Sequence, residues 1–149
     1  MNETILTVDA AGKFAGLVIP ALKARGAHVR GFVRSAGDAD TARANGADEI
    51  ATGELGDAAS VAAALNGVTS VFYIAPVALP DEAETGQAFV AAAIAAGVRR
   101  LMFSSVIHRV LAGLPNHANK APVEAAILDR EPHTLKAYFE ERAAQNSGR

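Results

Sequence analysis

The sequence contains no cysteine among its 149 residues. This absence excludes a disulfide framework, a thiolate metal site and a thiol nucleophile, and it suits the reducing conditions of the cytoplasm. A zinc site built on histidine is not expected either, because His108 and His117 have no carboxylate cluster beside them. Any catalytic chemistry of this chain must therefore come from other side chains or from a bound cofactor.

The sequence also lacks an excess of either charge. Lys and Arg number 14 against 16 Asp and Glu, which gives a formal net charge of -2. Because contacts with phosphate backbones need a clear basic excess, we expect no nucleic-acid partner. No apolar run reaches the roughly 20 residues of a membrane span. The N-terminus has Glu3 and Asp9 where a signal peptide would have a basic start and an apolar stretch, so we expect a cytoplasmic protein without a membrane partner.

Apolar residues, by contrast, make up half of the chain, enough to bury one sizeable core. We expect one folded domain over residues 1–130, followed by a C-terminal helix and tail over residues 131–149. Short β-branched runs alternate with helical patterns along the chain. The predicted strands are 4–8, 29–33, 49–52, 70–74 and 101–105, and the predicted helices are 13–25, 38–45, 57–65, 82–96, 119–129 and 135–145.

This alternation is typical of a parallel sheet that is covered by helices on both faces. The predicted fold is therefore α/β, a Rossmann-like, doubly wound parallel sheet of about five strands. Pro20 predicts a kink in the first helix. An i, i+3, i+4 series predicts which face of that helix packs on the sheet, and its members are Phe14, Leu17, Val18, Ala21 and Leu22. Sheets of this kind bind ligands at the carboxyl ends of their strands.

The turn after the first predicted strand has the composition of an anion site. It runs Asp9, Ala10, Ala11, Gly12, Lys13, Phe14 and leads directly into a helix. Free amides and the dipole at a helix N-terminus attract phosphates, so this segment is a candidate pyrophosphate site. A tight turn that needs Gly12 only for its backbone explains the same residues equally well.

Arg34 follows the second predicted strand, where a site that prefers NAD has an acidic residue for the ribose 2′-hydroxyl. Because an arginine can pair with a 2′-phosphate, Arg34 favours NADP over NAD, although an ordinary surface arginine is the alternative. Further candidate contacts for a dinucleotide follow the other strands, at Glu54, Leu55, Ala75, Pro76 and Ser104. Asp57 is expected to cap a helix, and only helix-dipole roles are expected for Asp38, Asp40, Glu82 and Glu84.

Five segments, in the right order, resemble the NmrA-like branch of the short-chain dehydrogenase superfamily. They are the turn 8–15, the pair 33–34, and the segments 53–57, 104–108 and 116–124. The resemblance implies an NADP-binding fold and an oxidoreductase activity on a small hydrophobic substrate. It also implies that Lys120 lies near the nicotinamide ribose, whereas an exposed helix lysine is the alternative interpretation.

Three features depart from the pattern of that family. Asp9 and Ala15 stand where the turn has its first and last glycine, and Asn116 stands where the superfamily has its catalytic tyrosine. Residue 129 is followed directly by a segment that resembles the family's C-terminal helix, without a sixth strand or substrate-covering segments. Two hypotheses follow: an NADP-dependent oxidoreductase, or a non-catalytic dinucleotide-sensing or regulatory domain that is a truncated remnant.

Asp9 is expected to weaken cofactor binding under either hypothesis. At about 4 Å and an effective dielectric near 20, its repulsion of a pyrophosphate is on the order of 4 kcal/mol. Its carboxylate could also cap the free amides of the turn, in which case glycine at this position would slightly lower stability. Without a sixth strand, the fifth predicted strand becomes a sheet edge, which favours a homodimer. The alternative is that the predicted helix 135–145 folds over this edge or docks on a partner subunit.

Overall fold

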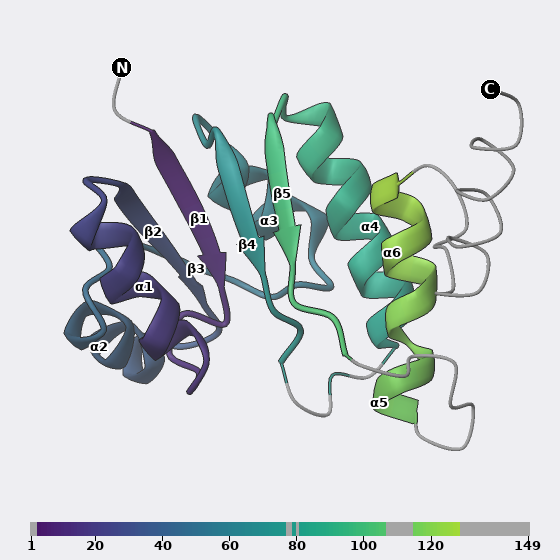
Figure 1. Ribbon diagram of the computed structural model, residues 1–149, viewed down its shortest axis with the longest axis horizontal. Coiled ribbons are helices and arrows are strands. Elements are labelled where there is room, and N and C mark those ends of the chain that lie inside the picture. Colours follow the sequence, from purple (N-terminus) through teal and green to yellow (C-terminus); the bar gives the residue numbers. More distant parts are fainter. Residues whose placement is uncertain (1–2, 77–78, 80, 107–114, 129–149) are drawn as a thin grey trace, which may run out of the picture.

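The computed structural model describes residues 3–76, 79, 81–106 and 115–128. Five parallel strands form one sheet in the order β3-β2-β1-β4-β5 (Figure 1). The strands are β1 (Thr4–Val8), β2 (His28–Val33), β3 (Glu49–Thr52), β4 (Ser70–Tyr73) and β5 (Arg100–Phe103). The helices are α1 (Ala15–Ala24), α2 (Ala36–Ala44), α3 (Ala58–Leu65), α4 (Glu82–Ala95), α5 (Pro115–Ala118) and α6 (Lys120–Leu128). This is the predicted Rossmann-like α/β fold, and its strand order reverses between β1 and β4.

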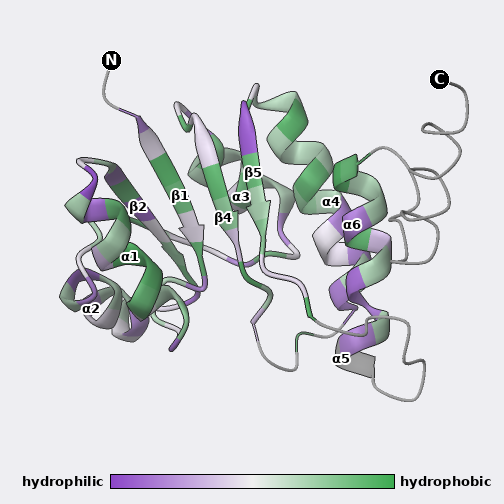
Figure 2. Cartoon of the chain, viewed as in Figure 1, coloured by the Kyte–Doolittle hydropathy of each residue, from purple (hydrophilic) through white to green (hydrophobic). Residues whose placement is uncertain are grey.

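Helices cover the sheet on both faces, as the alternating pattern predicts. α1 and α2 pack on one face, while α3 and α4 pack on the other, with α6 against α4 (Figure 1). Successive strand residues point to opposite faces, so Leu6 and Val8 of β1 belong to the core under α3 and α4. Val29 and Val33 of β2 belong to the core under α1 and α2. α1 is mostly green in Figure 2, whereas α2 mixes pale green alanines with purple charged residues.

Side-chain caps determine where two of the helices begin. Ser35 precedes α2 and accepts a hydrogen bond from the Asp38 amide at 3.2 Å, so this helix starts two residues before the predicted boundary. Asp57 precedes α3 and accepts hydrogen bonds from the amides of Ala59 and Ser60, at 3.2 and 3.1 Å. The predicted capping role of Asp57 is thereby confirmed.

The predicted inner face of α1 is only partly correct. Leu22 packs against the core and Val18 is half-buried, but Phe14 and Leu17 are 63% and 70% exposed. The fully buried residues of the helix are Ala15 and Ile19, each next to a residue of the predicted series. The small side chain of Ala15, not the large one of Phe14, lies against the sheet. Pro20 lies within α1 and is exposed to solvent.

α4 and α6 form a closely packed pair at the far side of the sheet. A Cβ atom at Gly86 of α4 would lie 2.5 Å from Cγ2 of Val123 in α6, so only glycine permits this approach. α6 agrees with the predicted helix 119–129 to within a residue at each end, and the single turn α5 precedes it. The predicted helix 135–145 and the predicted domain boundary at residue 130 lie outside the described residues.

An apolar groove of about 950 Å³ lies beside α1, on the face of the sheet where no described helix covers β4 and β5 (Figure 1). Among its lining residues are Ile5, Val18, Leu22, Phe72 and Met102. Within the described residues β5 is an edge strand, as predicted, and Met102 on it is 65% exposed.

Candidate functional site

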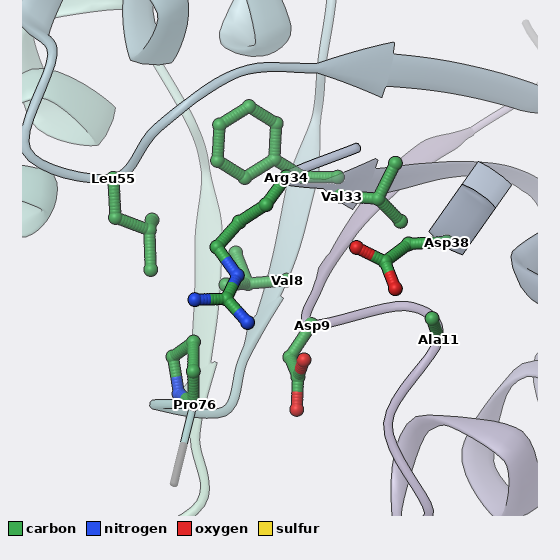
Figure 3. Close-up of a pocket in the computed structure, with 9 residues that line it drawn as sticks. Val8, Asp9, Ala11, Val33, Arg34, Asp38, Leu55 and Pro76 are labelled. Carbon is green, nitrogen blue, oxygen red and sulfur yellow. The ribbon is translucent and has the colours of Figure 1, made fainter. Parts of the chain in front are cut away.

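A pocket opens at the carboxyl ends of β1 and β2, closed by the segments that follow β3 and β4 (Figure 3). Its lining residues are Val8, Asp9, Ala11, Phe32, Val33, Arg34, Asp38, Leu55 and Pro76. The walls are apolar, and the charged groups are two carboxylates and one guanidinium. The pocket lies at the edge of the sheet where doubly wound folds bind their ligands.

The turn from Asp9 to Phe14 forms one side of the site. It is anchored at Ala10, whose amide donates to the Phe32 carbonyl at 3.2 Å and whose carbonyl accepts from Asn45 Nδ2 at 3.0 Å. The Gly12 amide donates to the Asp9 carbonyl at 2.7 Å. Within the described part of the chain, the amides of Ala11, Lys13 and Phe14 have no hydrogen-bond partner. These are the donors that the sequence predicted for an anion.

Asp9 occupies the space above Gly12. Its backbone has φ of 55°, a left-handed conformation. A Cβ atom at Gly12 would lie 2.2 Å from Asp9 Oδ2, so the carboxylate fills the room next to that glycine. No described residue forms a hydrogen bond with the carboxylate, and the residue that precedes α1, Phe14, provides no side-chain cap. The structure therefore does not show the alternative in which Asp9 caps the helix.

The charges around Asp9 do not balance one another. Burial raises the pKa of the Asp9 carboxyl above its ordinary value, the nearby Arg34 guanidinium acts against that rise, and the Asp38 carboxylate adds to it. Figure 3 shows the Arg34 guanidinium lying between Leu55, Pro76 and Asp9. Arg34 makes no hydrogen bond or ion pair with the described residues, so its donors are available to a ligand.

Asp38 lines the pocket, although only a helix-dipole role was expected for it. Its carboxylate lines the pocket and accepts a hydrogen bond from Ser35 Oγ at 2.8 Å. The cap at Ser35 is the signal that could have revealed it. With Ser35 as the N-cap, residue 38 falls in the first turn of α2, close to Arg34 in the chain.

The structure brings five of the predicted contact residues into the pocket: Asp9, Ala11, Arg34, Leu55 and Pro76. Three further predicted residues belong to the same turn as Asp9 and Ala11 but do not line the pocket: Gly12, Lys13 and Phe14. Glu54 is exposed, and Ala75 is buried where β4 ends. Ser104 lies after β5, half-buried, and its amide donates to the Tyr73 carbonyl at 2.9 Å.

Lys120 lies elsewhere, in a buried ion pair between α6 and α4. Its ammonium pairs with Glu82, and the two residues are 8% and 4% exposed. The ammonium also lies 5.7 Å from the centre of the Phe103 ring. Lys120 is therefore not an exposed helix lysine, and it does not line the pocket. Glu82 lies in the first turn of α4, as expected. Its pairing with the buried Lys120 ammonium was not expected.

Tyr73 lies in the same buried region. Its ring centre is 4.7 Å from that of Phe89 and 5.6 Å from that of Phe103. The hydroxyl has no hydrogen-bond partner among the described residues. Burial and the nearby Glu82 carboxylate raise the pKa of the Tyr73 phenol above its ordinary value. This hydroxyl is protonated and unpaired.

Two classes of feature are not found in the described ranges. No group of three or more His, Cys, Asp or Glu side chains is placed to hold a metal ion there. None of the helices described has the length and apolar character that crossing a membrane requires.

The fold resembles those of solved reductases. Triphenylmethane reductase from Citrobacter sp., complexed with NADP(H), is 23% identical with a TM-score of 0.73, over 84% of this chain and 45% of that one. An NADPH-dependent quinone oxidoreductase from Escherichia coli, complexed with NADPH, is 24% identical with a TM-score of 0.73, over 84% and 44%. A short-chain dehydrogenase/reductase superfamily protein from Agrobacterium tumefaciens with bound NAD is 25% identical with a TM-score of 0.66, over 84% and 44%.

The chain thus spans less than half the length of these solved proteins. Among curated protein sequences there is no match. At the level of families, the NmrA-like family matches residues 1–135, most of the chain. The sheet order and the position of the pocket agree with a dinucleotide-binding fold of this kind. The chain belongs to the NmrA-like family.

Proposed function

We propose that this chain binds NADP(H) at the carboxyl edge of its sheet. The observation that carries the proposal is Arg34, a guanidinium without a partner among the described residues, in a pocket at the end of β2. A ribose 2′-phosphate is the part of NADP(H) that such a group would bind. Two of the solved reductases with this fold were crystallised with NADP(H) or NADPH, which supports the choice of cofactor.

The residues present suit the adenine and the pyrophosphate of the cofactor, with one exception. Apolar side chains such as Phe32 and Leu55 provide walls for an adenine ring. The amides of Ala11, Lys13 and Phe14 would receive the pyrophosphate at the start of α1. Asp9 is the residue that departs from this fit. The bound nicotinamide would supply or accept a hydride.

Reduction of a small hydrophobic acceptor is the activity that accompanies this proposal. Cofactor binding without turnover is a second candidate, because Lys120 is held by Glu82 in a buried ion pair and not in the pocket. The two candidates are separated by following NADPH oxidation with a panel of quinones, aldehydes and ketones. Sustained oxidation above the protein-free rate supports the reductase, and its absence in a chain that binds NADPH supports the binding domain.

Cofactor preference provides the test of the binding proposal. A charge-assisted contact with phosphate contributes about 1.5–3 kcal/mol, so we expect NADP⁺ to bind about ten- to a hundredfold more tightly than NAD⁺. Calorimetric titration of the wild type and of Arg34→Ala measures this difference, which the substitution should abolish. Arg43→Ala is the matched control, because Arg43 is an exposed arginine of α2 that pairs with Asp40.

Three results would contradict the proposal. One is the absence of binding of either cofactor to the wild type. Another is an Arg34→Ala variant that keeps the preference of the wild type. Equal loss in Arg34→Ala and Arg43→Ala would show a general effect of positive charge and would also contradict a specific contact.

We further propose that the chain works in the cytoplasm and pairs with a second copy of itself. The compartment is supported by the NADP(H) assignment together with the absence of cysteine. Pairing is supported by the edge position of β5 and by the exposure of Met102 on it.

A further inference from the structure

Asp9 combines a rare backbone conformation with an unpaired charge at the centre of the candidate site. Its φ of 55° lies in the left-handed region, which side chains other than glycine, asparagine and aspartate seldom adopt. Its carboxylate lies above Gly12, where a Cβ atom would come within 2.2 Å of Oδ2. The side chain therefore covers the point at which the backbone of this turn would otherwise be open to a ligand.

The amides around Gly12 make this position important for an anion. Those of Ala11, Lys13 and Phe14 have no hydrogen-bond partner in the described ranges, and they precede the ten-residue helix α1. A phosphate that approaches these amides would approach the Asp9 carboxylate as well. Asp9 itself gains nothing from them, because it forms no hydrogen bond with any described residue.

The neighbours of Asp9 do not neutralise it. Arg34 after β2 attracts the carboxylate but does not form an ion pair with it, and Asp38 of α2 repels it. Lys13 of the same turn is exposed to solvent. Pro76, which lies beside the Arg34 guanidinium in Figure 3, carries no charge. Two carboxylates thus face one guanidinium in the pocket.

We infer that Asp9 sets the affinity of this site by holding a negative charge where the pyrophosphate of a dinucleotide would lie. This inference rests on the proposed function. It assigns separate roles to two of the three charged residues of the pocket, Arg34 and Asp9. Arg34 favours the 2′-phosphate, whereas Asp9 opposes the pyrophosphate, so the wild-type chain binds NADP(H) more weakly than the geometry of the turn would otherwise allow.

Two substitutions at Asp9 separate the effect of its charge from that of its bulk. Asp9→Asn keeps the shape and tolerates the left-handed conformation, while Asp9→Gly removes the side chain. Both should bind NADP⁺ tenfold or more tightly than the wild type, about 1.4 kcal/mol. Asp40→Asn is the matched control: it removes the same charge from an exposed position on α2 and should change the affinity less than about twofold.

A second ligand tests where the carboxylate acts. Adenosine 2′-monophosphate carries the phosphate for Arg34 but has no pyrophosphate. Its affinity should change less than about threefold in Asp9→Asn, since Arg34 and not the turn holds its charge. Calorimetric titrations with both ligands are made at low salt, and a thermal melt of each variant confirms that it is folded.

Each outcome has a definite meaning. Tightening of NADP⁺ binding in both Asp9 variants, with adenosine 2′-monophosphate nearly unaffected, supports the inference. Unchanged NADP⁺ affinity overturns it but leaves the proposed function standing, provided that the wild type binds. Tightening in Asp9→Gly alone, or equal tightening for both ligands, also overturns it. Absence of NADP⁺ binding in all the variants would refute the proposed function itself.

Discussion

At the scale of the single residue, Asp9 also affects the stability of the free protein. Burial raises its pKa in the folded chain, so the folded state holds this proton at pH values where the unfolded chain has lost it. Ionisation therefore lowers stability as the pH rises through the folded-state pKa, and the loss is complete only above that pKa. We expect Asp9→Asn to be more stable than the wild type at pH 7, with a difference that shrinks towards pH 3.

The measurement is denaturant unfolding of both proteins across that pH range. Only the difference between the two is informative, because the pKa values of other carboxyls, such as those of Asp48 and Glu49, are lowered and act in the opposite direction. A difference that stays constant with pH would contradict the account. The structure removes one of the two reasons for the expected loss in Asp9→Gly, because Asp9 does not cap α1 and its positive φ suits glycine.

Tyr73 allows a second prediction at this scale. Its hydroxyl is buried without a partner among the described residues, so removing it relieves a desolvation penalty. We expect Tyr73→Phe to be as stable as the wild type or up to about 1 kcal/mol more stable. Phe89→Ala, which removes the ring packed against Tyr73, should instead lose about 3–5 kcal/mol. A marked loss in Tyr73→Phe would show that the hydroxyl has a partner.

At the scale of the elements, the pair Lys120–Glu82 joins α6 to α4. Removing one partner leaves a buried charge alone, so Glu82→Gln and Lys120→Met should each lose about 3–5 kcal/mol of unfolding free energy. The double variant should recover much of that loss, since no uncompensated charge remains. Asp40→Asn is the control, because its exposed pair with Arg43 should contribute less than about 1 kcal/mol. Additive losses in the double variant would contradict a coupled pair.

The elements themselves could largely be predicted from the sequence. The alternation of β-branched runs with helical patterns places all five strands, because it reflects burial along the chain. The inner face of α1 could be placed only in part, since Phe14 and Ala15 fit the same periodicity and only packing on the sheet selects Ala15. Asp38 and Lys120 were misjudged for a related reason. Whether a charged residue of a helix faces solvent, a pocket or a buried partner depends on neighbours distant in sequence.

At the scale of the whole molecule, the groove beside α1 and the edge strand β5 lie together. Met102 of β5 lines the groove and is 65% exposed, so pairing with a second copy would bury it. We expect light scattering to give a mass that rises with concentration, and Met102→Lys to suppress the rise. Leu17→Lys is the control, because Leu17 is equally exposed on α1 but does not line the groove. A wild type that is monomeric at every concentration would contradict pairing.

The proposed dinucleotide site lies where the carboxyl ends of β1 and β2 meet. Titration of the isotope-labelled chain with NADP⁺, followed by amide NMR, tests it most directly because the readout is residue by residue. We expect shifts in the amide signals of Ala11, Gly12 and Arg34, which lie in or beside the pocket. We expect none at Gly67 and Gly97, which precede β4 and β5 and so lie at the amino ends of the strands. Shifts concentrated at the amino ends of the strands, or no shifts at saturating NADP⁺, would contradict the proposed site.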